Sequence, residues 1–272
     1  MDDTELSYHR LVEKRKACHR CSGLRNASVI REGEFDSAEV GPSTRWLGDR
    51  SPRVMVIGQD WGDEQAFKKQ GGVDLKQSAT NRMLRELLHS IGIVVSQAPE
   101  STAGSQVFLT NAVLCFKTGG CHSALRKEWF DSCGKEFLRP QVELLRPKVV
   151  VTLGERAFRA LLDAYQIEQP ASFADAVRGP GIALPGGARV FAVYHCGQRT
   201  LSSHREMDAQ FQDWQRIKAF LDAPGRPRRV AAPVRRMLPV SDAWAALAQG
   251  MRRPSGFARA SSGGGREHQA HR

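Results

Sequence analysis

Four short apolar runs, rich in β-branched residues, constrain the fold most, because segments with helical periodicity lie between them. The runs are residues 53–58, 107–113, 148–153 and 189–194. Helical patterns cover residues 79–92, 128–146, 155–165 and 204–222, and a charged lead-in helix covers residues 1–17. Strands that alternate with helices build a mostly parallel sheet with both faces covered. We therefore predict an α/β fold, a three-layer α/β/α sandwich around a four-stranded, mostly parallel sheet.

Polar side chains stand at the carboxyl ends of three of these strands. Asp60 follows the first strand within Gly58-Gln59-Asp60-Trp61-Gly62. Asn111 lies near the end of the second strand, and His195 directly follows the fourth. The carboxyl ends of parallel strands share one edge of a sheet, and ligands bind there in open α/β proteins. We therefore expect Asp60, Asn111 and His195 to converge on one site.

The charge distribution divides the chain into two parts. The formal net charge is +11, from 40 basic and 29 acidic residues, and this favours a polyanionic partner, nucleic acid before a membrane. Residues 223–272 contain 10 Arg and only 2 acids. We predict a domain over residues 1–222 and a basic, disordered tail over residues 223–272. Attraction to phosphates and a purely solubilising role are both open for the tail.

The first residues are polar and contain no apolar core of a secretory signal, and no run of residues is apolar enough to cross a membrane. We expect a cytoplasmic protein. In that compartment the six cysteines are more typical of metal ligands or buried thiols than of disulfides.

Five of the cysteines bear on a metal site. Cys18 and Cys21 form a Cys-x-x-Cys pair, whereas Cys115 and Cys133 are far apart, with Cys121 between them. Four thiolates can hold a structural zinc or an iron–sulfur cluster, and the wide second spacing favours the bulkier cluster. Unconnected buried thiols are the alternative.

The sixth cysteine, Cys196, directly follows His195. We interpret it as a small buried hydrophobe. A Cys196–His195 nucleophile pair is disfavoured, because neighbours along a strand point to opposite faces.

The order of the motifs resembles the uracil-DNA glycosylase superfamily, most closely its iron–sulfur, family 4-like branch, over about residues 15–222. The series runs Cys18-x-x-Cys21 with Leu24-Arg25, Gly58-Gln59-Asp60, Thr110-Asn111-Ala112-Val113-Leu114-Cys115, Cys133 with Arg139-Pro140-Gln141, the segment 145–154, and Tyr194-His195.

The resemblance implies a role for each matching residue. Cys18, Cys21, Cys115 and Cys133 match the ligands of a 4Fe-4S cluster, with zinc the less favoured cofactor. Asn111 matches the residue that reads the uracil edge, and His195 matches the start of the second catalytic motif.

The first motif departs from the iron–sulfur branch. Its Gly58-Gln59-Asp60 is closer to the Gly-Gln-Asp-Pro-Tyr-His of family 1 enzymes, whose Asp is catalytic. This resemblance supports Asp60 as a catalytic residue. It also implies that Gly58 and Gln59 contact the substrate. Trp61 and Phe67 are the candidates for the aromatic ring that stacks on uracil.

The second motif reads His195-Cys-Gly-Gln-Arg where the family has His-Pro-Ser. The loop that probes the duplex is therefore altered. In this loop, Arg199, Thr200 and Leu201 are the candidates for a wedge that enters the DNA.

These assignments lead us to expect a monomeric DNA-repair enzyme that hydrolyses the N-glycosidic bond of uracil in DNA. Asp60 would orient water, His195 would stabilise the departing base, and Asn111 would recognise it. No lysine is marked for a Schiff base, so a monofunctional enzyme is expected.

Three alternatives stay open at this stage. The altered second motif is compatible with a non-catalytic iron–sulfur module that binds damaged DNA. The second alternative is a glycosylase that becomes covalently trapped on its product through a loop histidine. His122 lies in the comparable loop. A metal-dependent hydrolase is the third.

Overall fold

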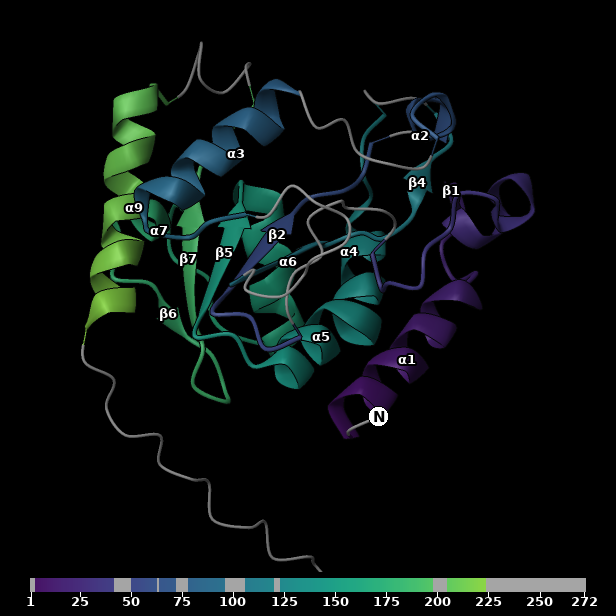
Figure 1. Ribbon diagram of the computed structural model, residues 1–272, viewed down its shortest axis with the longest axis horizontal. Helices are drawn as coiled ribbons and strands as arrows, with labels where there is room; N and C mark the ends of the chain where they lie inside the picture. Colours follow the sequence, from purple (N-terminus) through teal and green to yellow (C-terminus); the bar gives the residue numbers. More distant parts are fainter. Residues whose placement is uncertain are drawn as a thin grey trace, which may run out of the picture. The chain divides into compact units, whose positions relative to one another are not determined.

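A five-stranded sheet lies at the centre of the computed structural model, which describes residues 3–41, 50–62, 64–71, 78–95, 106–119, 123–197 and 205–223. The strand order is β3-β2-β5-β7-β6, and Figure 1 shows β2, β5, β7 and β6 following one another across the sheet. The strands are β2 (Val54–Gly58), β3 (Val107–Asn111), β5 (Val149–Leu153), β6 (Ile182–Ala183) and β7 (Arg189–Val193).

The first four strands in this order are parallel, as the sequence predicts. The fifth strand, β6, pairs antiparallel with β7 and lies in a segment predicted to be a loop. Because β6 has only two residues, it has no apolar pattern by which it can be recognised. The predicted three-layer α/β/α architecture is confirmed, with five strands in place of four.

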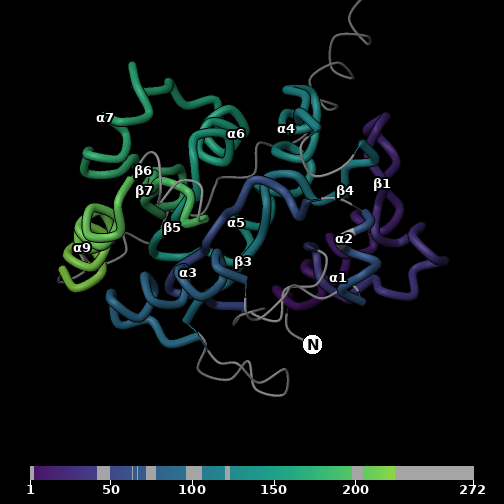
Figure 2. Tube along the Cα trace, turned by 90° about the horizontal axis from the view of Figure 1, so that it is seen from above, coloured from purple at the N-terminus to yellow at the C-terminus, as the bar shows by residue number. Residues whose placement is uncertain are grey.

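The two faces of the sheet carry separate hydrophobic clusters. In β2, Val54 and Val56 pack into the cluster with α3 (Ala79–Ser90) and α9 (Met207–Asp222). Met55 and Ile57 point the other way, into the cluster with α1, α4, α5 and α6. All four β2 side chains are buried because helices cover both faces. Figure 2 shows α3 and α9 on one side of the sheet and α6 on the other.

The predicted helix over residues 128–146 is divided into three parts: α4 (Lys127–Cys133), a π-helical turn (Gly134–Leu138) and α5 (Arg139–Leu145). Pro140 explains the interruption, since it has no N–H to donate to the carbonyl four residues earlier. The remaining helices are α1 (Asp3–Lys16), α2 (Glu64–Lys69), α6 (Glu155–Tyr165) and α7 (Phe173–Arg178). Of these, α2 and α7 occupy segments predicted to be loops.

The N-terminal segment is joined by strand pairing to the residues that follow β3 in the chain. The short strand β1 (Leu24–Arg25) pairs with β4 (Phe116–Lys117), so residues after Cys21 lie beside residues after Cys115. In Figures 1 and 2, α1, α2, β1 and β4 lie together at one end of the domain. A stretch of 3-10 turns follows over Ala27–Gly33.

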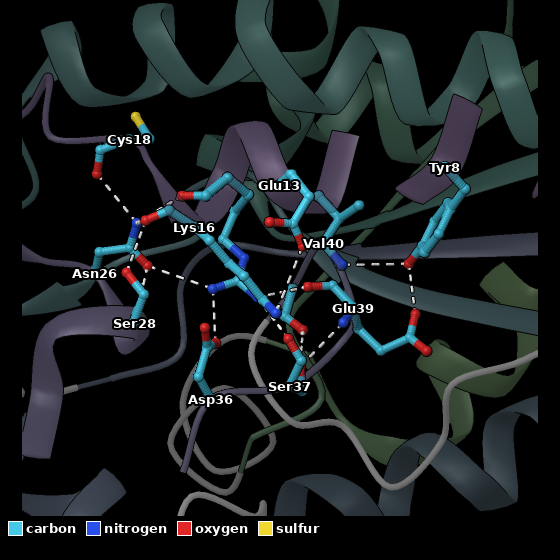
Figure 3. A network of polar contacts seen from close by, with 12 residues as sticks. Tyr8, Glu13, Lys16, Cys18, Asn26, Ser28, Asp36, Ser37, Glu39 and Val40 are labelled. Atoms are coloured by element: carbon cyan, nitrogen blue, oxygen red, sulfur yellow. Dashed lines mark hydrogen bonds and ion pairs between the residues drawn. The ribbon is translucent and has the colours of Figure 1, made fainter. Parts of the chain in front are cut away.

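A buried asparagine ties the end of α1 to this segment (Figure 3). Asn26 Nδ2 donates to the carbonyl oxygens of Arg15 (2.6 Å) and Cys18 (3.0 Å), and Asn26 Oδ1 accepts from the backbone N–H of Ser28. Ser28 Oγ adds one bond to the Lys16 carbonyl at 2.8 Å. Carbonyls at the end of a helix need such partners when they are buried. Asn26 therefore holds the segment that carries Cys18.

No helix among the described residues is long and apolar enough to cross a membrane. The predicted tail lies outside the described residues, apart from Ala223.

We expect Asn26→Ala to lower the free energy of unfolding by about 1–3 kcal/mol, because it removes the amide donor from the carbonyls of Arg15 and Cys18 in a buried place. Urea unfolding would measure the change, with Ser28→Ala as the matched control, since it removes a single bond. A loss for Asn26→Ala no larger than that for Ser28→Ala would contradict the assigned role.

Candidate functional site

The register between β2 and β3 builds the base of the site. Gly58 lies opposite Asn111, and the backbone N–H groups of Ala112 and Val113 donate to the carbonyls of Gly58 (2.9 Å) and Gln59 (3.0 Å). A Cβ atom at position 58 would collide with the terminal amide of Asn111. Glycine is needed here for close approach, and this approach places the loop after β2 beside Asn111.

A cavity of about 920 Å³ opens at the carboxyl ends of the strands. It is lined by six of the residues predicted from the sequence: Gly58, Gln59, Asp60, Trp61, Asn111 and His195. The start of α3 and the start of α6 form other parts of its wall. Residues 135 positions apart in the sequence, Asp60 and His195, thus share one cavity, as the parallel topology predicts.

Three donors hold the carboxylate of Asp60. Gln59 Nε2 donates to Oδ1 at 2.7 Å, and the backbone N–H of Gly62 donates to Oδ2 at 3.2 Å. Lys117 Nζ forms an ion pair with the same Oδ2 at 3.1 Å. Ionised carboxylates accept about four hydrogen bonds, so little freedom to rotate remains. Asp60 is therefore fixed in one orientation at the cavity wall.

Lys117, which holds the carboxylate of Asp60, is a residue that sequence reasoning missed. Its side chain is only 6% exposed and that of Asp60 only 7%, so the ion pair is largely shielded from water. Buried lysines are rare unless paired. Lys117 lies in β4, two residues after Cys115. No sequence pattern indicates its ion pair with Asp60, because the two residues are 57 positions apart.

The amide of Asn111 is satisfied at both ends in one orientation only. With its oxygen toward Trp61, Oδ1 accepts from the indole Nε1 at 3.0 Å, and Nδ2 donates to the carbonyl of Thr110 at 3.2 Å. The residue is 6% exposed, which makes unsatisfied contacts unfavourable. Trp61 thus contacts Asn111 through its N–H group.

His195 lies two residues beyond β7, and its ring is open to the cavity. The backbone N–H of Gly197 donates to Nδ1 at 3.0 Å, which is the pattern of a neutral imidazole with its proton on Nε2. The loss of surrounding water lowers the pKa of His195 below 6.5, and the negative charge of Asp60 opposes this shift. The ring is therefore neutral at pH 7 and presents an Nε2–H donor.

Cys196 turns away from His195. Its side chain is fully buried, and its Sγ lies 3.7 Å from the carbonyl of Thr80 at the start of α3. Burial raises the pKa of this thiol to about 12. A thiol with so high a pKa is a poor nucleophile, which agrees with its interpretation as a small buried hydrophobe.

Phe67, the second stacking candidate, is not among the described residues that line the cavity. Its ring centroid lies 4.2 Å from that of Phe116, in a small separate cluster against which Trp61 also packs. Other candidates lie outside the described residues, so their roles stay predictions: Arg199, Thr200, Leu201, Cys121 and His122.

The four predicted ligand cysteines line a second, smaller cavity of about 110 Å³, which also contacts Arg15. Cys18 and Cys21 come from the turn after α1, Cys115 precedes β4, and Cys133 ends α4. Arg15 is fully buried, and its Nε has no hydrogen-bond partner among the described residues. Three distant segments thus bring four thiols and the side chain of Arg15 to the same small cavity.

The thiols differ in acidity because they interact. A hydrogen bond with Cys133 lowers the pKa of Cys21 to about 7, and the same bond raises the pKa of Cys133. Burial raises the pKa of Cys115 to about 12. Within the described residues, no group of three or more His, Cys, Asp or Glu side chains has the arrangement of a metal-ion site. The four cysteines line one small cavity, and Cys21 and Cys133 contact each other in it.

Comparison with known proteins agrees with this geometry. Residues 46–220 match the family model described as the uracil DNA glycosylase superfamily. The chain is 28% identical over 198 residues to the type-5 uracil-DNA glycosylase of Pyrobaculum aerophilum, covering 69% of this chain and 81% of that protein. It is 23% identical over 214 residues to the type-4 uracil-DNA glycosylase of Thermotoga maritima, covering 78% and 94%.

We expect Gly58→Ala to reduce the free energy of unfolding by about 1–3 kcal/mol, because the new methyl group overlaps the Asn111 amide. In an Asn111→Ala background the overlap is gone, so the same change should lose less than about 1 kcal/mol. Urea unfolding of the four proteins would measure the coupling. Equal losses in both backgrounds would show that the two residues do not meet.

We expect an NMR titration to give His195 a pKa below 6.5 and Asp60→Asn to lower it further, because that change removes the negative charge that favours the imidazolium. The exposed Asp131→Asn on α4 is the matched control and should leave the titration unchanged. A higher pKa in Asp60→Asn would contradict the electrostatic contact.

Proposed function

Because the chain belongs to the uracil DNA glycosylase superfamily, we propose that it is a DNA-repair enzyme that hydrolyses the N-glycosidic bond of uracil in DNA and leaves an abasic site. The convergence of Asp60, Asn111 and His195 in one cavity is the observation that carries this proposal. The target nucleotide has to leave the base stack, since its sugar carbon cannot be reached inside a duplex.

Recognition of the base is assigned to Asn111. Uracil presents an N3–H donor beside the O4 acceptor, and an amide offers an acceptor and a donor side by side. Cytosine presents the reverse order along the same edge. A buried amide that is left unpaired costs about 1–3 kcal/mol, enough to reject the wrong base. The shielding of Asn111 supports this role.

Stabilisation of the leaving group is assigned to His195. As the bond between C1′ and N1 breaks, its electron pair stays on uracil, and the negative charge gathers at the O2 and O4 oxygens. A neutral imidazole whose Nδ1 is already occupied by Gly197 can donate Nε2–H to O2. Removing one donor of this kind typically lowers the reaction rate by about 10²–10³-fold.

Asp60 is assigned to the sugar and the water. Its negative charge stabilises the cationic sugar, and the one acceptor position that its three donors leave open can orient water toward C1′. Water then forms the new bond to C1′, and its proton passes to the carboxylate of Asp60. Lys117 holds the carboxylate in place.

A monofunctional reaction is proposed, without cleavage of the strand. Cleavage through a Schiff base needs a free, unprotonated amine at C1′. Lys117 contacts Asp60, but its ammonium group is engaged by that carboxylate, and it is not among the described residues that line the cavity.

A 4Fe-4S cluster is proposed for the cysteine cavity, held by Cys18, Cys21, Cys115 and Cys133. Four thiols around one small cavity, which Arg15 also lines with an Nε–H that has no partner among the described residues, suit a cluster whose sulfurs accept hydrogen bonds. They suit it better than a single zinc ion, whose four ligands meet at one point. Such a cluster would crosslink the turn after α1, the residues before β4 and the end of α4. Its role here is structural, and it keeps Lys117 close to Asp60.

The decisive test is base release from an oligonucleotide with a single uracil, single- or double-stranded, with hot alkali to reveal abasic sites. We expect release by the wild type, a loss of about 10²–10³-fold in His195→Ala, and a comparable or larger loss in Asp60→Asn. Asp131→Asn, remote from the cavity, should match the wild type. Strands should stay intact without alkali, and borohydride should trap no protein–DNA adduct.

No release by a wild type that still binds the oligonucleotide would refute the proposed reaction and favour a non-catalytic module that binds damaged DNA. A borohydride adduct that disappears in Lys117→Met would refute the monofunctional reaction alone.

The cluster makes a separate prediction. The anaerobically purified chain should show the broad visible absorbance of an iron–sulfur cluster and contain iron and sulfide in equal amounts. Cys133→Ser should lose both signals, whereas Cys196→Ser, a matched change at a buried cysteine outside the cavity, should keep them. Stoichiometric zinc without sulfide would replace the cluster by a zinc site.

A further inference from the structure

We infer that Trp61 is a specificity-determining residue: through its indole N–H it locks the Asn111 amide in the one orientation that matches uracil and not cytosine. The inference rests on the proposed function and deepens it, since it assigns to Trp61 a role other than stacking on the base. The bond concerned joins Trp61 Nε1 to Asn111 Oδ1 at 3.0 Å.

Two groups flank the amide of Asn111, and each of them can act in only one way in a hydrogen bond. The indole Nε1–H is only a donor, and the backbone carbonyl of Thr110 is only an acceptor. With Oδ1 toward Trp61 and Nδ2 toward Thr110, both contacts are hydrogen bonds. If the amide turned by 180°, a donor would face a donor and an acceptor would face an acceptor. One orientation is therefore strongly preferred before any ligand arrives.

The locked amide has one bonding position left at each end. Its oxygen has two lone pairs, of which Trp61 uses one, and its nitrogen has two hydrogens, of which Thr110 uses one. One acceptor and one donor therefore stay available, side by side, at the cavity wall. This pair complements N3–H and O4 of uracil. Cytosine, with N3 as acceptor and an amino group at C4, would require the reversed amide.

Trp61 can fix the orientation of the Asn111 amide because its own ring is held in place. Its ring packs against the cluster of Ala27, Ile30, Phe67 and Phe116, and a Cβ atom at Gly41 would lie 3.2 Å from its Cζ2. The backbone on either side is also fixed, since Val113 N–H donates to Gln59 and Gly62 N–H to Asp60. An indole that cannot swing away keeps its N–H aimed at Asn111.

Binding of two non-cleavable oligonucleotides would test the inference. Each carries one target nucleotide, 2′-fluoro-2′-deoxyuridine or 2′-fluoro-2′-deoxycytidine. We expect the wild type to prefer the uracil ligand and Trp61→Phe, which keeps an aromatic ring and loses the N–H, to reduce that preference about tenfold, the factor of one ordinary hydrogen bond. Trp214→Phe is the matched control, because its Nε1 has no hydrogen-bond partner among the described residues, and it should keep the full preference.

A Trp61→Phe variant that keeps the full preference would overturn the inference, and so would a wild type that binds both ligands equally. Failure of the proposed function would look different: no base release by a wild type that still prefers the uracil ligand.

A second measurement does not depend on the folding of Trp61→Phe. In a ¹⁵N-labelled chain, Asn111→Leu should shift the indole N–H resonance of Trp61 and leave that of Trp214 in place. A Trp61 resonance that does not move would overturn the hydrogen bond itself.

Discussion

The parallel register of β2 against β3 is the constraint on which the rest of the site depends. It sets Gly58 opposite Asn111, and the absence of a side chain at position 58 is what lets the amide sit against the β2 backbone. A shift by one residue would turn every side chain of the strand to the opposite face. It would also exchange the two hydrophobic clusters of the core. The geometry of the site and the packing of the sheet are thus specified by the same hydrogen bonds.

The ion pair between Lys117 and Asp60 links the cavity at the strand ends to the cysteine cavity. Lys117 lies two residues after Cys115, so whatever holds the cysteine segment also holds the cation beside the carboxylate. The backbone bond from Lys117 N–H to the Gly62 carbonyl, at 3.4 Å, joins β4 to the loop after β2. This connection gives the proposed cluster a physical role at a distance from the cavity: it would order the wall on which Asp60 is carried.

Helices and strands with a strong periodic pattern could be predicted from the sequence. Elements that are defined by strand pairing or by an interruption of a helix could not. Helix α6 was predicted with its observed ends, because Gly154 and the apolar spacing mark it. Strand β6 and helix α7 are too short for a pattern, and Pro140 divided a helix that the spacing makes continuous. In the site, residues at strand ends were placed together by topology alone. Lys117 and the indole contact of Trp61 depend on side-chain geometry that no spacing records.

The selectivity that we propose for this site depends on hydrogen bonds that its polar groups already form. Gly197 occupies Nδ1 of His195 and leaves Nε2–H as the donor. Trp61 and Thr110 occupy half of the Asn111 amide and leave one acceptor beside one donor. In the proposed reaction, each group would therefore use hydrogen-bonding positions that are set before substrate binds, with no reorganisation as charge develops. Preorganisation of this kind also explains why the motif residues alone do not define the site: the partners that restrict them come from elsewhere in the fold.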